Sequence, residues 1–317
     1  MPTPSPEYLV DSMVEDVRSE YITPNSQNLF VDEDIIKHLD KAMRSKIIPL
    51  INSVREEYWV NIYDQPVVSS SPNYTLPPRS SGAMLRDVVF VDPQGNEIEL
   101  TRLSPIQIKS TFPFGYQLPL YTFGYYLQDD QVILYPQQAS NATAYTLRMK
   151  YLRRPNNLVT VTECGLITAI VSNVITVDNI PSTWSTATTF DIIQNFPQFN
   201  SIEDGTTITN INTLTSEITL TSAPTGLAVG MYLCPTLMSC IPQIPYECFD
   251  LLIAAGAARL ARGIGDSQGL ELANKNYEDI SADFVKLVDP RVQGGRKIVQ
   301  NRNTGWGWGQ IGSPFLR

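Results

Sequence analysis

The stretch that decides the fold is PYECFDLLIAAGAARLARGIGD, residues 245–266, because a helical pattern returns here after a long β-type middle. Its apolar residues keep helical spacing, and its small residues at 254–258 allow a neighbouring helix to pack closely. We expect a helix from Pro245 to Gly263 or Gly265, with the glycine at its end. A second amphipathic helix follows over 267–290, with Asp266 or Ser267 as its cap and Pro290 as its stop. Its predicted apolar face holds Leu270, Ala273, Tyr277, Ile280, Phe284 and Leu287.

The N-terminal sixty residues are also predicted to be helical. SPEYLVDSMVEDVRSE, residues 5–20, places Leu9, Met13, Val14 and Val17 on one stripe, and Ser5-Pro6 is a typical helix start. A longer helix is expected over 33–59, with Asp32 as its N-cap and a kink or split at Pro49. We expect these helices to pack with the C-terminal pair as one helical-bundle domain, since the two sets flank everything else.

Between the helices, the composition changes to that of β-structure. Residues 60–156 are rich in proline and aromatic residues, with expected hairpin turns at 93–95 and 129–130 and a strand near 144–155. Residues 157–240 are rich in Thr, Ile and Val and predict an inserted β module, a small sandwich or barrel. The predicted fold class is therefore α+β: a helical bundle made by both ends of the chain, an inserted β-rich region and an extended C-terminal tail. The expected divisions are 1–59, 60–156, 157–240, 241–290 and 291–317.

Charge is distributed unevenly along the 317 residues. The net charge is −9, which argues against a general nucleic-acid binder, and no Lys or Arg lies between Arg154 and Arg259. The stretch 291–317 holds five basic residues and no acid, so the remainder carries −14. A basic tail on an acidic body suits docking onto an acidic neighbour, such as another copy of the chain.

The cysteines and the N-terminus indicate where the chain is made. The four cysteines form no CxxC pair and fit no common zinc spacing, which favours buried free thiols. No signal peptide is recognisable at the N-terminus, and no apolar run approaches the ~18 residues of a membrane span. We expect synthesis in a reducing cytoplasm and no membrane partner.

Motifs for catalysis or cofactor binding are weak in this sequence. His38 is the only histidine, and a Ser-His-Asp or Cys-His centre would have to use it. Neither a phosphate-binding loop nor a dinucleotide fingerprint occurs, and the two loops that resemble calcium sites lack the full ligand spacing. We therefore expect no enzyme activity, no metal and no cofactor.

The last seventeen residues, NRNTGWGWGQIGSPFLR at 301–317, combine tryptophan with glycine. Tryptophan is a favoured interface anchor, and alternation would place both indoles on one face of an extended segment. The sequence favours a docking peptide here, and a disordered end with incidental aromatic residues is the alternative.

Five segments resemble, in their order, the head-to-tail connector (adaptor or neck) proteins of tailed bacteriophages. They are SSGAMLRDVVFVDPQGNEIELTRLSP (80–105), YLQDDQVILYP (126–136), LRMKYLRRPNNLV (147–159), IPYECFDLLIAAGAARLARGIGD (244–266) and DPRVQGGRKIVQNRN (289–303). The N-terminal helices are similar to that family's opening helices, whereas the β module at 157–240 departs from its smaller members.

The resemblance implies a structural ring protein of the virion neck, made in the host cytoplasm and located between portal and tail. It implies a dodecameric ring as the self-assembly, with portal protein above and tail, nozzle or fibre proteins below, and genomic DNA passing through without specific binding. A C-terminal arm over 291–317 would dock on the portal. The partner-binding residues carried over to that arm are Arg296, Lys297, Arg302, Trp306, Trp308, Ile311, Phe315 and Leu316.

Two other classes remain open on the residues alone. A fibre or spike module could recognise receptors or glycans through the Tyr- and Thr-rich β region. A hydrolase could use His38, and it would lose its activity in His38→Ala.

Overall fold

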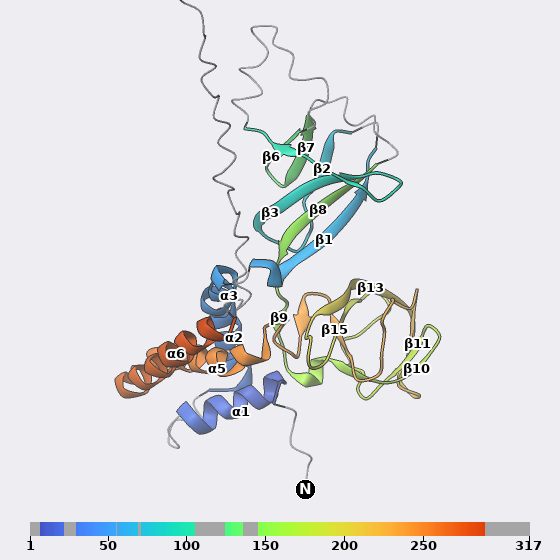
Figure 1. Ribbon diagram of the computed structural model, residues 1–317. Helices are drawn as coiled ribbons and strands as arrows, with labels where there is room; N and C mark the ends of the chain where they lie inside the picture. Colours follow the sequence, from blue (N-terminus) through green and yellow to red (C-terminus); the bar gives the residue numbers. More distant parts are fainter. Residues whose placement is uncertain are drawn as a thin grey trace, which may run out of the picture.

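Figure 1 shows the computed structural model of the chain, which describes residues 7–21, 30–54, 56–68, 71–104, 124–135 and 145–288. The chain begins in a helical domain, passes through two facing β-sheets and a closed β-barrel, and returns to the helical domain. Helices from both ends of the chain share one hydrophobic core, with α2 and α1 packed on α5. The predicted α+β class and the joining of the two helical ends are therefore confirmed.

The helical elements are α1 (Val10–Tyr21), α2 (Asp32–Ala42), the π-helical turn η2 (Met43–Ile47), α3 (Ile48–Val54), the 3-10 turns η3 (Glu56–Trp59) and η6 (Tyr246–Cys248), α5 (Phe249–Ile264) and α6 (Ser267–Val288). The predicted stripe of α1 is buried as expected, but the helix begins at Val10, later than Pro6. Asp32 is not the cap of α2. Val31 occupies that position without a side-chain cap bond, and Asp32 is the first helical residue, where its charge suits the helix dipole.

Pro49 disturbs its helix in a particular way. Proline has no N–H to donate, and its ring crowds the carbonyl four residues earlier, that of Ser45. The helical run accommodates this with the wider π turn Met43–Ile47, directly before α3. The interruption expected from the sequence is therefore present, as a π turn inside a continuous helical run.

The small residues of α5 allow α2 to approach it closely. A Cβ atom added at Gly256 would lie 2.6 Å from Cδ2 of Leu39, a fully buried residue of α2. Gly265 ends α5 with φ of 79°, a left-handed conformation that glycine adopts without strain. The backbone N–H of Gly269 then donates to Oδ1 of Asp266 at 3.0 Å, which confirms Asp266 as the residue that fixes the start of α6.

Two four-stranded sheets form the β-rich layer, in the orders β1-β8-β3-β4 and β2-β7-β6-β5. Both predicted hairpins are present, one between β3 and β4 and one between β6 and β7. The sheets share a core that includes Phe90, Val132 and Met149. The strands are β1 (Val60–Pro66), β2 (Asn73–Thr75), β3 (Ser80–Val91), β4 (Glu97–Glu99), β5 (Thr101–Arg102), β6 (Gly124–Gln128), β7 (Gln131–Tyr135) and β8 (Thr146–Arg153).

The inserted module is a closed barrel with the strand order β10-β11-β14-β13-β12-β15, which decides between the sandwich and the barrel. Its core includes Ile167, Ile218 and Trp184, whose indole meets the ring of Phe190 edge-on at 4.7 Å. The strands are β10 (Gly165–Val171), β11 (Val174–Val177), β12 (Thr189–Ile193), β13 (Ser201–Asn212), β14 (Glu217–Leu220) and β15 (Tyr232–Pro235). A short parallel pair, β9 (Asn157–Leu158) and β16 (Met238–Ser239), joins the entry and exit of the module, and the 3-10 turn η5 (Val161–Glu163) follows β9.

One end of the barrel belongs to the core of the helical domain. Tyr232 and Ile193 of the barrel strands are buried in that core, together with Phe199 of the loop after β12. The ring of Phe199 lies 5.3 Å from Phe249 of α5 and 5.8 Å from Tyr8, measured between ring centroids. Apolar contacts therefore attach the barrel to the helical domain, and Figure 1 shows the two side by side. No helix in the described part of the chain is both long and apolar enough to cross a membrane.

Candidate functional site

The partner-binding residues expected from the sequence all lie in 291–317, outside the described residues. They are Arg296, Lys297, Arg302, Trp306, Trp308, Ile311, Phe315 and Leu316. Their role remains a prediction. The helical domain that precedes them is described through Val288, and its surface carries two groups of like charges that the sequence did not reveal.

The first group, here called the acidic face, consists of Glu7, Glu15, Asp16 and Glu20 near or on α1 and Asp250 in the first turn of α5. Partial burial raises the pKa of Asp16, and the nearby Asp250, Glu15 and Glu7 raise it further. Partial burial also raises the pKa of Glu20, with Asp16 and Asp250 adding to the effect. The like charges are therefore close enough to repel one another, and within the described residues none of the five forms an ion pair.

The second group, here called the basic face, consists of Lys41, Lys46, Arg259 and Arg262, from α2, η2 and the last turns of α5. Partial burial lowers the pKa of Lys46, and Arg259 and Arg262 lower it further. The Lys46 ammonium also lies 4.4 Å from the ring centroid of Tyr277 on α6. In the described part of the chain, no carboxylate pairs with these four cations.

The two faces lie at opposite ends of α5, with Asp250 in its first turn and Arg262 in its last. Each sign agrees with the helix dipole, which favours acids at the N-terminus and bases at the C-terminus. Because the groups are separated along the helix, they do not neutralise each other within one chain. The acidic face of one copy would, however, complement the basic face of another.

His38, the one histidine, borders the basic face. Partial burial lowers its pKa, and so do the neighbouring cations Lys41 and Arg259. Its Nδ1 is buried and has no hydrogen-bond partner among the described residues. A catalytic histidine of the Ser-His-Asp kind needs a carboxylate on that nitrogen to hold and orient the ring. This geometry does not favour the hydrolase hypothesis.

A buried ionic cluster joins the sheets to the barrel. Arg79, in the turn before β3, directs its guanidinium to both carboxylate oxygens of Asp191 on β12, at 2.6 Å each. Asp191 is 0% exposed and Arg79 is 6% exposed. Arg79 also binds Asn156 at 2.9 Å and lies 3.0 Å from Asp204 of β13, which pairs with Arg153 of β8 at 2.7 Å.

Both carboxylate oxygens of Asp191 accept more than one hydrogen bond in this cluster. Besides Arg79, the carboxylate accepts from the side-chain amide of Asn156 at 2.8 Å, and from the backbone N–H groups of Gly205 and Leu237 at 3.0 and 2.9 Å. Gln243, just before α5, accepts from the backbone N–H of Asn156 at 2.9 Å. One carboxylate thus fixes the sheets, the barrel and the segment leading to α5 in a single arrangement.

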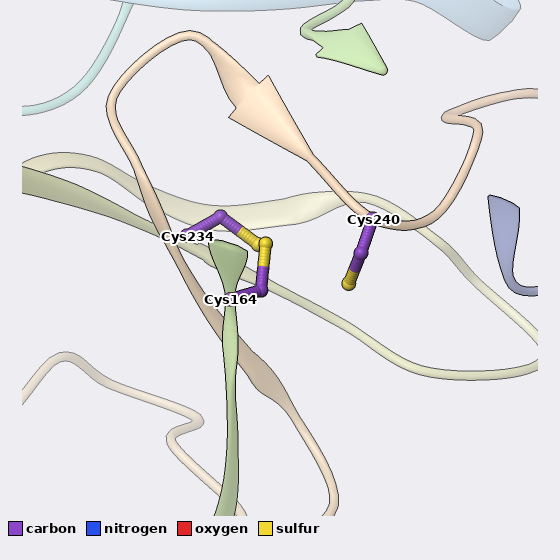
Figure 2. A group of neighbouring side chains, drawn as sticks. All are labelled: Cys164, Cys234 and Cys240. Atoms are coloured by element: carbon purple, nitrogen blue, oxygen red, sulfur yellow. The ribbon is translucent and has the colours of Figure 1, made fainter. Parts of the chain in front are cut away.

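The sequence correctly indicated buried free cysteines, but it missed that three of them converge (Figure 2). Antiparallel pairing of Gly165 with Leu233 places Cys164 beside Cys234, seventy residues later in the chain. Cys240 reaches the same place from the segment after β16. The three sulfur atoms lie within 4.8 Å of one another, and they are the group of side chains best suited to hold a metal in the described part of the chain.

Burial raises the pKa of the Cys164 and Cys240 thiols well above the usual value. For Cys234, burial acts in the same direction, but the thiols of Cys164 and Cys240 and the backbone N–H of Cys240 hydrogen-bond to its sulfur, and together they lower its pKa below the usual value. The fourth cysteine, Cys248, lies apart, and burial raises its pKa. A strand-register argument could have paired Cys164 with Cys234, whereas no sequence spacing points to Cys240.

Comparison of the chain with protein-family models and with curated proteins found no match.

Proposed function

We propose that the chain is a non-enzymatic structural subunit that assembles into a ring at the head-to-tail junction of a tailed bacteriophage. The observation that carries the proposal is the pair of complementary faces at opposite ends of α5. A contact between unlike patches is heterologous, and repeated contacts of this kind close into a ring when the rotation between subunits permits. The family resemblance from the sequence supplies the location in the virion neck, between portal and tail.

The remaining features of the chain suit such a subunit. The first and the last described helices form one domain, and the sheets and the barrel lie beside it in Figure 1. In this proposal the sheets and the barrel face tail, nozzle or fibre proteins. The arm over 291–317 follows α6 and would dock on the portal protein through its aromatic and basic residues. A net charge of −9 agrees with a channel that lets genomic DNA pass, because phosphate contacts would retain it.

A charge-exchange experiment tests the ring contact directly. Lys41→Glu combined with Arg262→Glu reverses two exposed cations of the basic face, and we expect self-association to weaken by roughly tenfold or more. Combining this chain with a second one that carries Glu20→Lys and Asp250→Lys should restore association. Lys286→Glu, an exposed cation on α6 outside the basic face, is the matched control.

Sedimentation or light scattering at low and high salt would measure these associations, since the contact should weaken as salt screens it. Unchanged association of the doubly reversed chain would contradict the proposal that these faces form the ring contact.

Removal of 301–317 tests the docking arm separately. The truncated chain should unfold at the same denaturant concentration as the full chain and still self-associate, because the contacts described above lie within 7–288. It should fail to join portal-containing heads in an assembly assay. Normal incorporation of the truncated chain would reject the docking role of the arm.

A second candidate function is recognition of a receptor or glycan by the barrel. Phe196 is 59% exposed and meets the exposed Tyr246 ring at 5.8 Å, beside a hollow of about 340 Å³ lined by 194–198 and 229–231. Exposed aromatic rings are suitable platforms for sugars. Glycan binding that is lost in Phe196→Ala, in a chain that does not form rings, would favour this function over the first.

A further inference from the structure

We propose that Cys164, Cys234 and Cys240 form a binding site for a single thiophilic metal cation, held by three thiolates. The inference is independent of the ring proposal, because it rests on side chains inside one chain. It concerns the place where the barrel meets the helical domain.

The geometry of the three sulfur atoms is close to that of a thiolate site. Metal–sulfur bonds of about 2.3 Å place two sulfurs on a common ion at most about 4.6 Å apart. The three sulfurs lie within 4.8 Å of one another without an ion, so only a small inward movement is needed. They come from the residue before β10, from β15 and from the segment after β16, and Figure 2 shows Cys164 and Cys234 turned toward each other.

The chemistry of the three ligands selects a soft cation. Sulfur ligands favour Cu(I), Zn(II) and related cations over Mg²⁺ or Ca²⁺, which take oxygen. In the described part of the chain, no carboxylate or imidazole joins the three sulfurs. Asp191, the buried acid of the barrel, is already occupied by Arg79. Three thiolates alone suit a three-coordinate ion such as Cu(I), whereas Zn(II) would need a fourth ligand from outside the group.

Burial makes such a site specific and slow to exchange. Cys234 and Cys240 are 0% exposed and Cys164 is 1% exposed, so the ion would enter during folding or a local opening. Each thiol that coordinates releases its proton to solvent. An exposed sulfur cluster would oxidise, whereas these side chains are enclosed by apolar neighbours of the helical core.

The site would connect two parts of the fold. Cys164 and Cys234 belong to the end of the barrel, and Cys240 belongs to the segment that leads to α5. The backbone N–H of Val10, the first residue of α1, donates to the carbonyl oxygen of Cys240 at 3.0 Å. A bound ion would therefore fasten the barrel to both ends of the helical domain and stabilise the native chain.

The test uses the full chain, unfolded with chelator and reductant and refolded with Cd(II), Zn(II) or Cu(I) as the only added metal. We expect about one ion per chain after desalting, a cadmium–thiolate charge-transfer band of three-sulfur intensity and a thermal midpoint raised by several degrees. Cys234→Ala and Cys240→Ala should each lose the ion and the thermal shift. Cys248→Ala removes a thiol that is equally buried but outside the cluster, and it should retain both.

Two results would overturn the proposal. The first is wild-type chain that refolds without retaining any of the three metals. The second is metal retention that is the same in Cys240→Ala as in Cys248→Ala. Because the band intensity and the ion count are measured on the wild-type chain, the test stands even if a cluster variant fails to fold.

Discussion

The two buried polar clusters at the base of the barrel differ in how they are satisfied. In the ionic cluster, the charge of Asp191 is neutralised by Arg79, and its oxygens accept hydrogen bonds from the side chain of Asn156 and from two backbone N–H groups. In the cysteine cluster, the three sulfur atoms hydrogen-bond to one another and to the backbone N–H of Cys240, and thiols are weak donors. The carboxylate of Asp191 is thus paired within the chain, although Nε of Arg153 and Nε2 of Gln243 beside it have no partner among the described residues. The three sulfurs, by contrast, are open to an ion from outside. The acidic and basic faces near the two ends of α5 are likewise open, because their charges form no ion pair within the described residues.

The largest effect is expected from removing Asp191, the central carboxylate of the ionic cluster. Asp191→Ala would leave Arg79 as a buried charge without its main partner, and such a loss costs about 3–5 kcal/mol of unfolding free energy. Asp64→Ala is the matched control, because Asp64 pairs with Arg148 at 2.9 Å at a partly exposed site. We expect that control to cost at most about 1 kcal/mol. Denaturant titration of both variants measures the difference in unfolding free energy. Similar losses would show that the buried ion pair of Arg79 and Asp191 contributes no more than the exposed pair.

Two glycines of α5 differ in the same way: Gly256 is closely packed and Gly263 is not. The Cβ of Gly256→Ala would clash with Leu39, at a cost of about 1–3 kcal/mol of unfolding free energy. Alanine's higher helix propensity would offset about 1 kcal/mol of that cost, and we expect a net loss. Gly263→Ala meets no atom within 4 Å and should stabilise the chain by about 0.5–1 kcal/mol. Thermal unfolding of the two variants measures both changes in stability, which we expect to be opposite in sign. A stabilising Gly256→Ala would contradict close packing of α2 on α5.

Without an ion, the cysteine cluster should contribute little at a pH low enough to protonate all three thiols, because the lowered pKa of Cys234 stabilises the folded chain only while its sulfur is a thiolate. In chelator and reductant at that low pH, Cys234→Ala and Cys248→Ala should each lower the unfolding free energy by about 1–2 kcal/mol, because each removes one buried sulfur. The two variants should therefore unfold at similar denaturant concentrations. A much larger loss for Cys234→Ala under these conditions would show that the cluster is stabilising in its own right, as a closed hydrogen-bonded group.

The smallest effect is expected at the acidic face. Folding raises the pKa of Asp16, so its charge destabilises the folded chain above that pKa, and the penalty disappears as pH falls below the unfolded value. Asp16→Asn should thus stabilise the chain at pH 7 by a few tenths of a kcal/mol, and the gain should vanish near pH 3. Urea midpoints at the two pH values measure it, with the exposed Glu271→Gln on α6 as control. A gain that persists at low pH would point to a cause other than charge.

Features set by neighbours in the sequence were predictable, and features set by distant residues were not. The stripe of α1, the turn at Gly95 and the end of α5 at Gly265 follow from local periodicity and turn chemistry. The partnership of Arg79 with Asp191 spans 112 positions and depends on how two separate β units meet. The cysteine cluster likewise needs the β10–β15 register. The acidic and basic faces could not be predicted from the net charge, because the net charge adds together groups that the fold places at opposite ends of α5. The docking arm remains a prediction from sequence.

The parallel pairing of β9 with β16 holds the entry and the exit of the barrel module side by side. The chain connectivity alone would therefore allow the barrel to be exchanged as a unit or replaced by a short linker. Such a shortcut would, however, remove Asp191 and Asp204, the acidic partners of Arg79, and it would expose the ring of Phe249 on α5. The barrel is therefore bound to its host domain by its contacts, since its removal would require simultaneous changes at Arg79, Asn156 and the surface of α5.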